Sequence, residues 1–218
     1  MNGPRWLYLH GFASGPESHK GVALAAHYAR RDVTLARLDL RVPSLERLRF
    51  SAMKRALVDA IGGPRERAVV FGSSLGGLTA CRVAEDDARV TALVLLAPAF
   101  RLAERWRLRL GDDGWRRWSD SGWLDIHDYA NDRPARVDFE FMRELETLDG
   151  GGDGWPDVRV PTLIVHGRAD DTVEVQRSRD FARGKRHIEL IEVDDGHELV
   201  ASLPRIAAEA DRFLSPFL

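Results

Sequence analysis

The chain has 218 residues, a formal net charge of −2 at pH 7 and a single cysteine. This length fits one domain, which buries about 70% of its unfolded surface and needs no disulfide bonds. The near-zero charge argues against a nucleic-acid or anionic-membrane partner. No apolar run reaches the length of a membrane span, and the N-terminus lacks a signal-peptide pattern. We therefore expect a soluble protein of a reducing compartment, most simply the cytoplasm.

Short apolar runs alternate with longer amphipathic runs, a pattern typical of buried strands and surface helices. In chain order, the predicted elements are strand 5–12, helix 18–31, strand 32–40, helix 44–62, strand 68–73, helix 75–87, strand 90–99, strand 162–167, helix 173–184, strand 187–193 and helix 199–214. Ser44 is the expected N-cap of its helix. Six apolar strands separated by helices predict an α/β fold with a mainly parallel sheet and helices on both faces.

Residues 100–157 interrupt the alternation and are too long for a bare loop. They contain helix-like runs at 101–110 and 138–149 and five of the six tryptophans. We predict an inserted cap at 100–157 on a core formed by residues 1–99 and 158–218. Most of these tryptophans are expected to pack within the cap, with one or two lining a substrate cavity. The apolar cap is equally compatible with a homodimer interface. Six arginines of the cap are expected on a solvated helix face: Arg101, Arg105, Arg107, Arg109, Arg116 and Arg117. The alternative is that they bind an anionic leaving group.

The turn after the third predicted strand carries the most specific chemical motif. Gly72-Ser73-Ser74-Leu75-Gly76 fits the pattern Gly-x-Ser-x-Gly with Ser74 at its centre. The two glycines permit a sharp turn between strand and helix that exposes a nucleophilic serine. Centring the pattern on Ser73 would need glycine at positions 71 and 75, where the chain has Phe and Leu. A phosphate-binding loop is excluded because the chain lacks Gly-x4-Gly-Lys-Ser/Thr.

A serine nucleophile needs a general base, which a third group orients. His197 follows the last predicted strand in a flexible turn, from which it can reach Ser74. The adjacent carboxylates Asp170 and Asp171 follow the strand before it, and Asp170 is the expected orienting acid. The chain order Ser, Asp, His is that of α/β-hydrolases.

Backbone N–H groups are expected to stabilise the oxyanion of the reaction. One is that of Leu75, directly after the nucleophile, and the other is that of Phe12, in the loop after the first strand. His10 and His166 each end a strand just before a glycine and are expected to make structural hydrogen bonds. This chemistry requires no cofactor and no metal ion.

The segments 8–21, 72–77 and 194–199 read YLHGFASGPESHKG, GSSLGG and DDGHEL. They resemble the α/β-hydrolase superfamily and, more narrowly, small bacterial esterases of the YqiA type and the mammalian mitochondrial abhydrolase-domain esterases and thioesterases. The resemblance implies the α/β-hydrolase fold, the triad Ser74, Asp170 and His197, and oxyanion donors at Phe12 and Leu75. The chain departs from the superfamily pattern by lacking its first two strands and by having Glu174 where many relatives have proline.

These features predict a serine hydrolase that cleaves a small-molecule carboxylic ester or thioester through an acyl-serine intermediate. Dehalogenase and epoxide hydrolase chemistry would require Asp at position 74 and is disfavoured. Acyl transfer, amide cleavage and perhydrolysis use the same triad and stay open. A non-catalytic receptor with this fold is a further alternative, disfavoured because all three triad residues are present.

Overall fold

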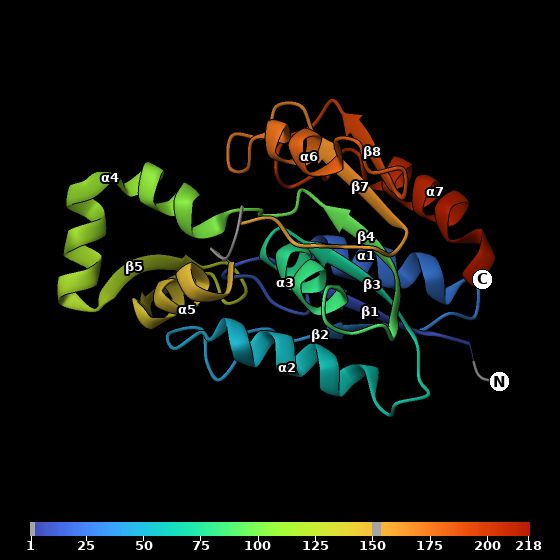
Figure 1. The fold of residues 1–218 in the computed structure, drawn as a ribbon, viewed down its shortest axis with the longest axis horizontal. Helices are drawn as coiled ribbons and strands as arrows, with labels where there is room; N and C mark the ends of the chain where they lie inside the picture. The colour runs from blue at the N-terminus through green and yellow to red at the C-terminus, as the bar shows by residue number, and fades with distance from the viewer. Residues whose placement is uncertain (1–2, 150–153) are drawn as a thin grey trace.

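Six parallel strands form the central sheet of the computed structural model, which describes residues 3–149 and 154–218 (Figure 1). The strands are β1 (Arg5–Leu9), β2 (Leu35–Leu38), β3 (Ala68–Ser73), β4 (Val90–Leu96), β7 (Thr162–Gly167) and β8 (Ile188–Val193). Their order across the sheet is β2-β1-β3-β4-β7-β8. Because β3 and β4 lie in the middle and are covered on both faces, their sequences are almost continuously apolar.

Helices cover both faces of this sheet (Figure 1). The helices α1 (His19–Ala29) and α7 (Leu203–Leu214) pack on one face, while α2 (Phe50–Ile61), α3 (Leu75–Ala84) and α6 (Val175–Ala182) pack on the other. Alternate residues of β1 point to opposite faces of the sheet. Tyr8 therefore packs in the hydrophobic cluster between the sheet and α1 and α7, whereas Leu9 packs in the hydrophobic cluster on the face of α2 and α3. The predicted parallel sheet with helices on both faces is confirmed.

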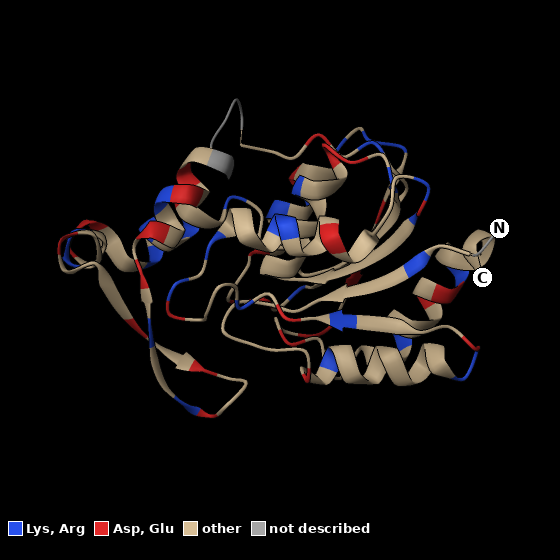
Figure 2. Ribbon diagram, turned by 90° about the horizontal axis from the view of Figure 1, so that it is seen from below, with Lys and Arg blue, Asp and Glu red and all other residues tan. Residues whose placement is uncertain are grey.

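Charged residues of both signs are interspersed over the molecule (Figure 2), in keeping with the net charge of −2. None of the helices in the described part of the chain has the length and apolar character of a membrane span.

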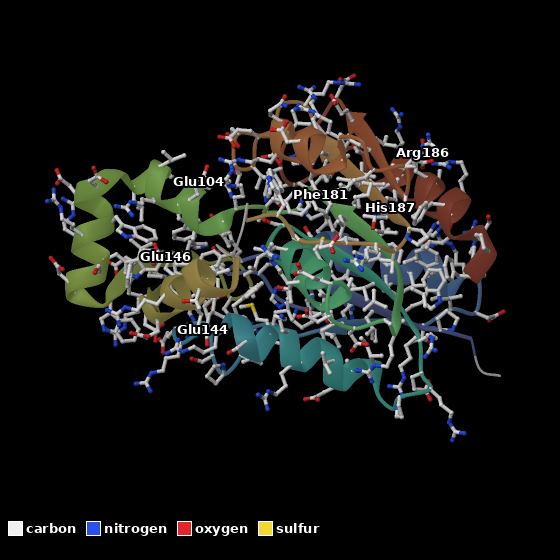
Figure 3. The ribbon with its side chains drawn as sticks, viewed as in Figure 1. Glu104, Glu144, Glu146, Phe181, Arg186 and His187 are labelled. Atoms are coloured by element: carbon white, nitrogen blue, oxygen red, sulfur yellow. The ribbon has the colours of Figure 1, made fainter. Side chains whose placement is uncertain are left out.

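The insertion between β4 and β7 lies at the end of the molecule opposite the two termini (Figure 1). It consists of α4 (Leu102–Ser121), the antiparallel hairpin of β5 (Trp123–Asp128) and β6 (Arg133–Asp138), and α5 (Glu140–Asp149). Its apolar side chains join the same cluster as α2 and α3. A polar contact strengthens this attachment, since Glu144 of α5 (labelled in Figure 3) accepts hydrogen bonds from the backbone N–H and the hydroxyl of Ser51 in α2.

The structure differs from the predicted elements within the insertion and at the start of α2. The sequence did not predict the β5–β6 hairpin, whose apolar alternation is short and whose second strand contains Pro134. The helix predicted at 101–110 is confirmed: at Gly111 (φ 65°, ψ 173°) the backbone leaves the helical conformation, and a second helical segment of α4, which the sequence did not predict, follows up to Ser121. Ser44 accepts a hydrogen bond from the Arg47 N–H, but this closes a turn outside the helix, and α2 begins only at Phe50.

Candidate active site

Ser74 occupies the tight turn between β3 and α3 with φ 51° and ψ −114°, a backbone conformation that L-residues rarely adopt. The surrounding backbone holds it there. The Ser74 N–H donates to the Leu96 carbonyl at 2.9 Å, and the Ser74 carbonyl accepts from the Gly77 and Ala99 N–H groups at 2.9 and 3.0 Å. Such strain persists only where neighbouring contacts fix the turn, and it is common at active sites.

Two glycines of the motif are required by close backbone approach. A Cβ on Gly72 would lie 2.6 Å from the Gly76 carbonyl oxygen, and a Cβ on Gly76 would collide with the backbone of Leu9. The helix α3 therefore starts directly against β1 and β3, which brings its first residues and Ser74 to the carboxyl ends of the strands.

The imidazole of His197 bridges the other two predicted triad residues. Its Nε2 lies 3.1 Å from Ser74 Oγ, and its Nδ1 lies 2.7 Å from Asp170 Oδ2. The loop that carries His197 follows β8 and is closed by Asp195, whose carboxylate accepts from the N–H groups of Gly196 and Ser202. The structure thus brings together side chains that are far apart in the sequence.

Asp170 is buried, and burial alone would raise the pKa of its carboxyl group. Hydrogen bonds from His166, from His197 and from the Val173 N–H outweigh burial and hold the pKa well below its usual value. The other carboxylate oxygen, Oδ1, accepts from the N–H groups of Thr172 and Val173 at 2.9 and 2.7 Å. Asp170 is therefore an ionised, rigidly held acceptor for His197.

Two other histidines hold the backbone near this site, as expected from the sequence. The Nε2 of His10 accepts from the Leu40 N–H at 2.9 Å, and its Nδ1 lies 2.9 Å from the Gly11 carbonyl. Because Nε2 accepts, His10 is neutral, and burial lowers its pKa. His166 lies between Ser178 Oγ and the Val173 carbonyl, and its Nε2 is 3.1 Å from Asp170 Oδ2. This contact with the acid was missed, because nothing in the sequence pairs the two residues.

The two predicted oxyanion donors lie beside Ser74. A Cβ on Gly11 would be 3.3 Å from that of Ser74, so the loop that contains Phe12 abuts the serine. Phe12 and Leu75 line the same cavity as Ser74. Neither N–H donates to a protein acceptor among residues 3–149 and 154–218, so both are available to a ligand. Their role as oxyanion donors stays a prediction.

A cavity of about 950 Å³ opens over Ser74 and His197. The insertion contributes much of its apolar wall: Trp106, Leu110, Leu124 and Ile126. Of the predicted cap tryptophans, Trp115 and Trp118 are buried within the insertion, and only Trp106 lines the cavity. In the described part of the chain, no group of three or more His, Cys, Asp or Glu side chains is arranged to hold a metal ion.

Arg105 differs from most of the arginines of the insertion. Arg101, Arg107 and Arg116 form ion pairs with nearby carboxylates at the surface. Arg105 is partly buried and lines the cavity. Burial lowers its pKa, although the negative charges of Glu174 and Asp170 act to raise it. No carboxylate of the described residues lies within ion-pair distance of it.

Its neighbour Glu104, labelled in Figure 3, is already engaged by Arg101 and by Arg177 of α6. Arg105 therefore places a cation in the wall of the cavity that holds Ser74, without an ion-pair partner among the described residues.

The model of a family described as "Uncharacterised protein family (UPF0227)" matches residues 5–210. A search of the curated proteins finds no match for the sequence.

Several solved structures share the fold over almost the whole chain. Alpha/beta hydrolase domain-containing protein 10 from mouse is 18% identical with a TM-score of 0.80, covering 100% of this chain and 93% of its own. Est1E from Butyrivibrio proteoclasticus, solved with ferulic acid bound, is 22% identical with a TM-score of 0.81, covering 98% of this chain and 89% of its own.

A structure described under LipS and LipT, two metagenome-derived lipolytic enzymes, is 19% identical with a TM-score of 0.70, covering 98% of this chain and 95% of its own. At these identities the likeness shows a common fold, and the predicted α/β-hydrolase fold is confirmed.

Proposed function

The chain belongs to the UPF0227 family, and on that premise we propose that it is a serine hydrolase that cleaves a carboxylic ester or thioester through an acyl-Ser74 intermediate. The observation that carries the proposal is the hydrogen-bond chain from Ser74 Oγ through His197 to Asp170, with distances of 3.1 and 2.7 Å. A serine hydroxyl becomes an effective nucleophile only when a base within such reach removes its proton.

In the first half of the reaction, His197 Nε2 accepts the hydroxyl proton while Ser74 Oγ bonds to the carbonyl carbon of the substrate. The negative charge on the carbonyl oxygen is stabilised by the Phe12 and Leu75 N–H groups. The leaving oxygen or sulfur then takes the proton from His197 as its bond to carbon breaks. The product of this half-reaction is an ester of the acyl group with Ser74.

In the second half, a water molecule gives a proton to His197 and attacks the acyl carbon. The bond to Ser74 Oγ breaks, the proton returns to the serine, and the carboxylic acid is released. Ionised Asp170 stabilises the imidazolium in both halves and keeps His197 Nδ1 protonated, so that Nε2 faces the serine.

The walls of the cavity support a substrate that is partly apolar and partly anionic. We propose that residues 100–157 act as a cap over Ser74, with Trp106, Leu110 and Ile126 in contact with an acyl or aryl group. Arg105 would bind an anionic group of the same substrate, because it is a partly buried cation without a carboxylate partner in the described structure. Location in the cytoplasm and formation of a homodimer stay predictions from the sequence.

A fluorophosphonate probe tests the assignment of the nucleophile, because it reacts with activated serines. We expect the wild type to be labelled, with the adduct mapped to Ser74 by peptide mass spectrometry. Ser73→Ala is the matched control and is expected to remain labelled, whereas Ser74→Ala is not. The opposite pattern would assign the nucleophile to Ser73, and a folded wild type that takes no label would reject the proposal.

A further inference from the structure

Lys20 lies in the first turn of α1 and is only 7% exposed. Lysine is almost never buried unless its ammonium group is paired. A cation at a helix N-terminus is also repelled by the helix dipole. Burial lowers the pKa of Lys20, although the negative charges of Glu198, Asp170 and Asp195 act to raise it. A buried ammonium group at this position therefore lowers the stability of the fold, which suggests that Lys20 has a functional role.

The partners of the Lys20 ammonium group are on the loop that carries the candidate base. Its Nζ lies 3.1 Å from the Glu198 carbonyl oxygen and 3.4 Å from that of His197. It also lies 3.4 Å from a carboxylate oxygen of Glu198, but that side chain is 79% exposed. An ion pair so exposed to water contributes little, so the backbone carbonyls are the main partners.

The other hydrogen bonds of this loop's main chain hold different residues, and one of them runs from the Ala169 N–H to the Asp195 carbonyl oxygen. Asp195 binds the N–H groups of Gly196 and Ser202, which close the loop at its two ends. Between these ends the backbone turns at Leu199, which has φ 53°. The Lys20 ammonium group, from α1, contacts the main chain at His197 and Glu198 between these ends.

We propose that Lys20 is a positioning residue, whose ammonium group fixes the main chain at His197 and Glu198 so that the imidazole stays between Asp170 and Ser74. The inference rests on the proposed hydrolase function. A displacement of the base by ~1 Å is enough to lower a rate by about 100-fold. Lys20 prevents such a displacement of His197 and does not itself transfer a proton.

Substitution by methionine keeps most of the volume of the side chain and removes its charge. We expect Lys20→Met to lower kcat by roughly 10- to 100-fold without raising KM. Lys54→Met is the matched control, because Lys54 makes a surface ion pair with Asp86 and does not line the cavity. Glu198→Gln should retain nearly full kcat, because it leaves both backbone carbonyls in place.

A chemical rescue separates positioning from a general loss of packing. The Lys20→Cys variant, whose thiol would lie at the cavity that Lys20 lines, is treated with 2-bromoethylamine, which restores an ammonium group on a side chain of nearly the same length, and mass spectrometry verifies the modification. We expect kcat to recover in the treated variant and to stay unchanged in the treated wild type, where Cys81 is buried. The low-field proton resonance of the hydrogen bond between His197 and Asp170 should weaken or shift in Lys20→Met and return on rescue.

The pH profile supplies a second readout. The charged groups that act on Lys20 are Glu198, Asp170 and Asp195, and the main chain of His197 and Glu198 accepts its hydrogen bonds. Tyr8 of β1 lines the same cavity, and burial raises its pKa to about 12. Since the pKa of Lys20 is lowered, the wild type should lose kcat on the alkaline side as the ammonium group deprotonates. In Lys20→Arg this limb should move to higher pH, because a guanidinium stays protonated.

Two outcomes would overturn the inference alone: a loss of kcat that aminoethylation does not restore, or a Lys20→Met variant with wild-type kcat, in which a raised KM would indicate contact with substrate. A wild type that neither hydrolyses esters nor reacts with a fluorophosphonate would instead overturn the proposed function, and this inference with it.

Discussion

His166 Nε2 lies 3.1 Å from Asp170 Oδ2, the same carboxylate oxygen that lies 2.7 Å from His197 Nδ1. Two imidazoles thus meet on one buried oxygen, and together with the Val173 N–H they keep the acid ionised despite its burial. His166 and the backbone N–H groups of Thr172 and Val173 hold the Asp170 carboxylate in place, so that it orients the imidazole of His197.

Removal of the charge at Asp170 should nearly abolish catalysis. In Asp170→Asn, the amide N–H₂ group can donate to His197 Nδ1, which stabilises the tautomer whose proton is on Nε2. That nitrogen can then no longer accept the proton of Ser74, so we expect kcat to fall by about 10⁴-fold. Asp171→Asn is the matched control, because Asp171 is exposed and, among the described residues, its carboxylate accepts a hydrogen bond from the Thr172 hydroxyl alone. Steady-state kinetics on one ester would show the contrast, and equal rates for the two variants would remove Asp170 from the triad.

The close approach of α3 to β1 predicts a steric requirement at Gly76. In Gly76→Ala the new methyl group meets the backbone of Leu9, which cannot move aside as a flexible side chain could. We expect a loss of at least about 2 kcal/mol in the free energy of unfolding. Urea denaturation measures it, with Gly63→Ala as the control, since no atom lies within 4 Å of a Cβ there. Unchanged stability in Gly76→Ala would mean that the turn is looser than described.

His10 should make the stability of the protein depend on pH. Burial lowers its pKa in the folded state, so as the pH falls the unfolded chain takes up a proton first, at the ordinary histidine value of about 6.5. The stabilisation by neutral His10 is therefore complete above that value and is lost as the pH falls toward the lower pKa of the folded state.

The measurement compares the free energy of unfolding of the wild type and of His10→Gln at about pH 7.5 and pH 5.5. Glutamine does not titrate, so the variant should be less stable at the higher pH but lose less stability between the two. The other histidines are common to both proteins and cancel. A variant with the same or a steeper loss would contradict the neutral state of His10.

Arg105 predicts a preference for anionic esters. A matched pair of substrates is the p-nitrophenyl monoester of glutaric acid and p-nitrophenyl butyrate, which differ chiefly by a terminal carboxylate. We expect Arg105→Gln to lower kcat/KM for the anionic ester by about 10-fold, the order of a hydrogen bond to a charged group, and to spare the neutral ester. Arg116→Gln, at an exposed ion pair with Asp113, should change neither. Equal effects of Arg105→Gln on both esters would refute an anion site.

The sequence predicts the strands well where burial on both faces makes them continuously apolar, as in β3 and β4. It also places Ser74, because the spacing of Gly72 and Gly76 reflects a steric need that acts over four residues. The β5–β6 hairpin is different, since one face is exposed and its apolar signal is short.

Some contacts between distant segments leave no signal in the sequence. The choice between Asp170 and Asp171 depends on which carboxylate turns toward His197, and the two are adjacent in the chain. Likewise, the pairing of Lys20 with the carbonyl of His197 spans 177 residues and involves a backbone atom, which carries no sequence signal.

The hydrolysis of p-nitrophenyl esters from acetyl to palmitoyl, with the wild type beside Ser74→Ala, tests the central claim most directly. We predict turnover by the wild type with an optimum chain length set by the cavity over Ser74, and loss of turnover to the buffer background in a Ser74→Ala variant that remains folded. Equal hydrolysis by the two proteins would contradict catalysis by an acyl-Ser74 intermediate.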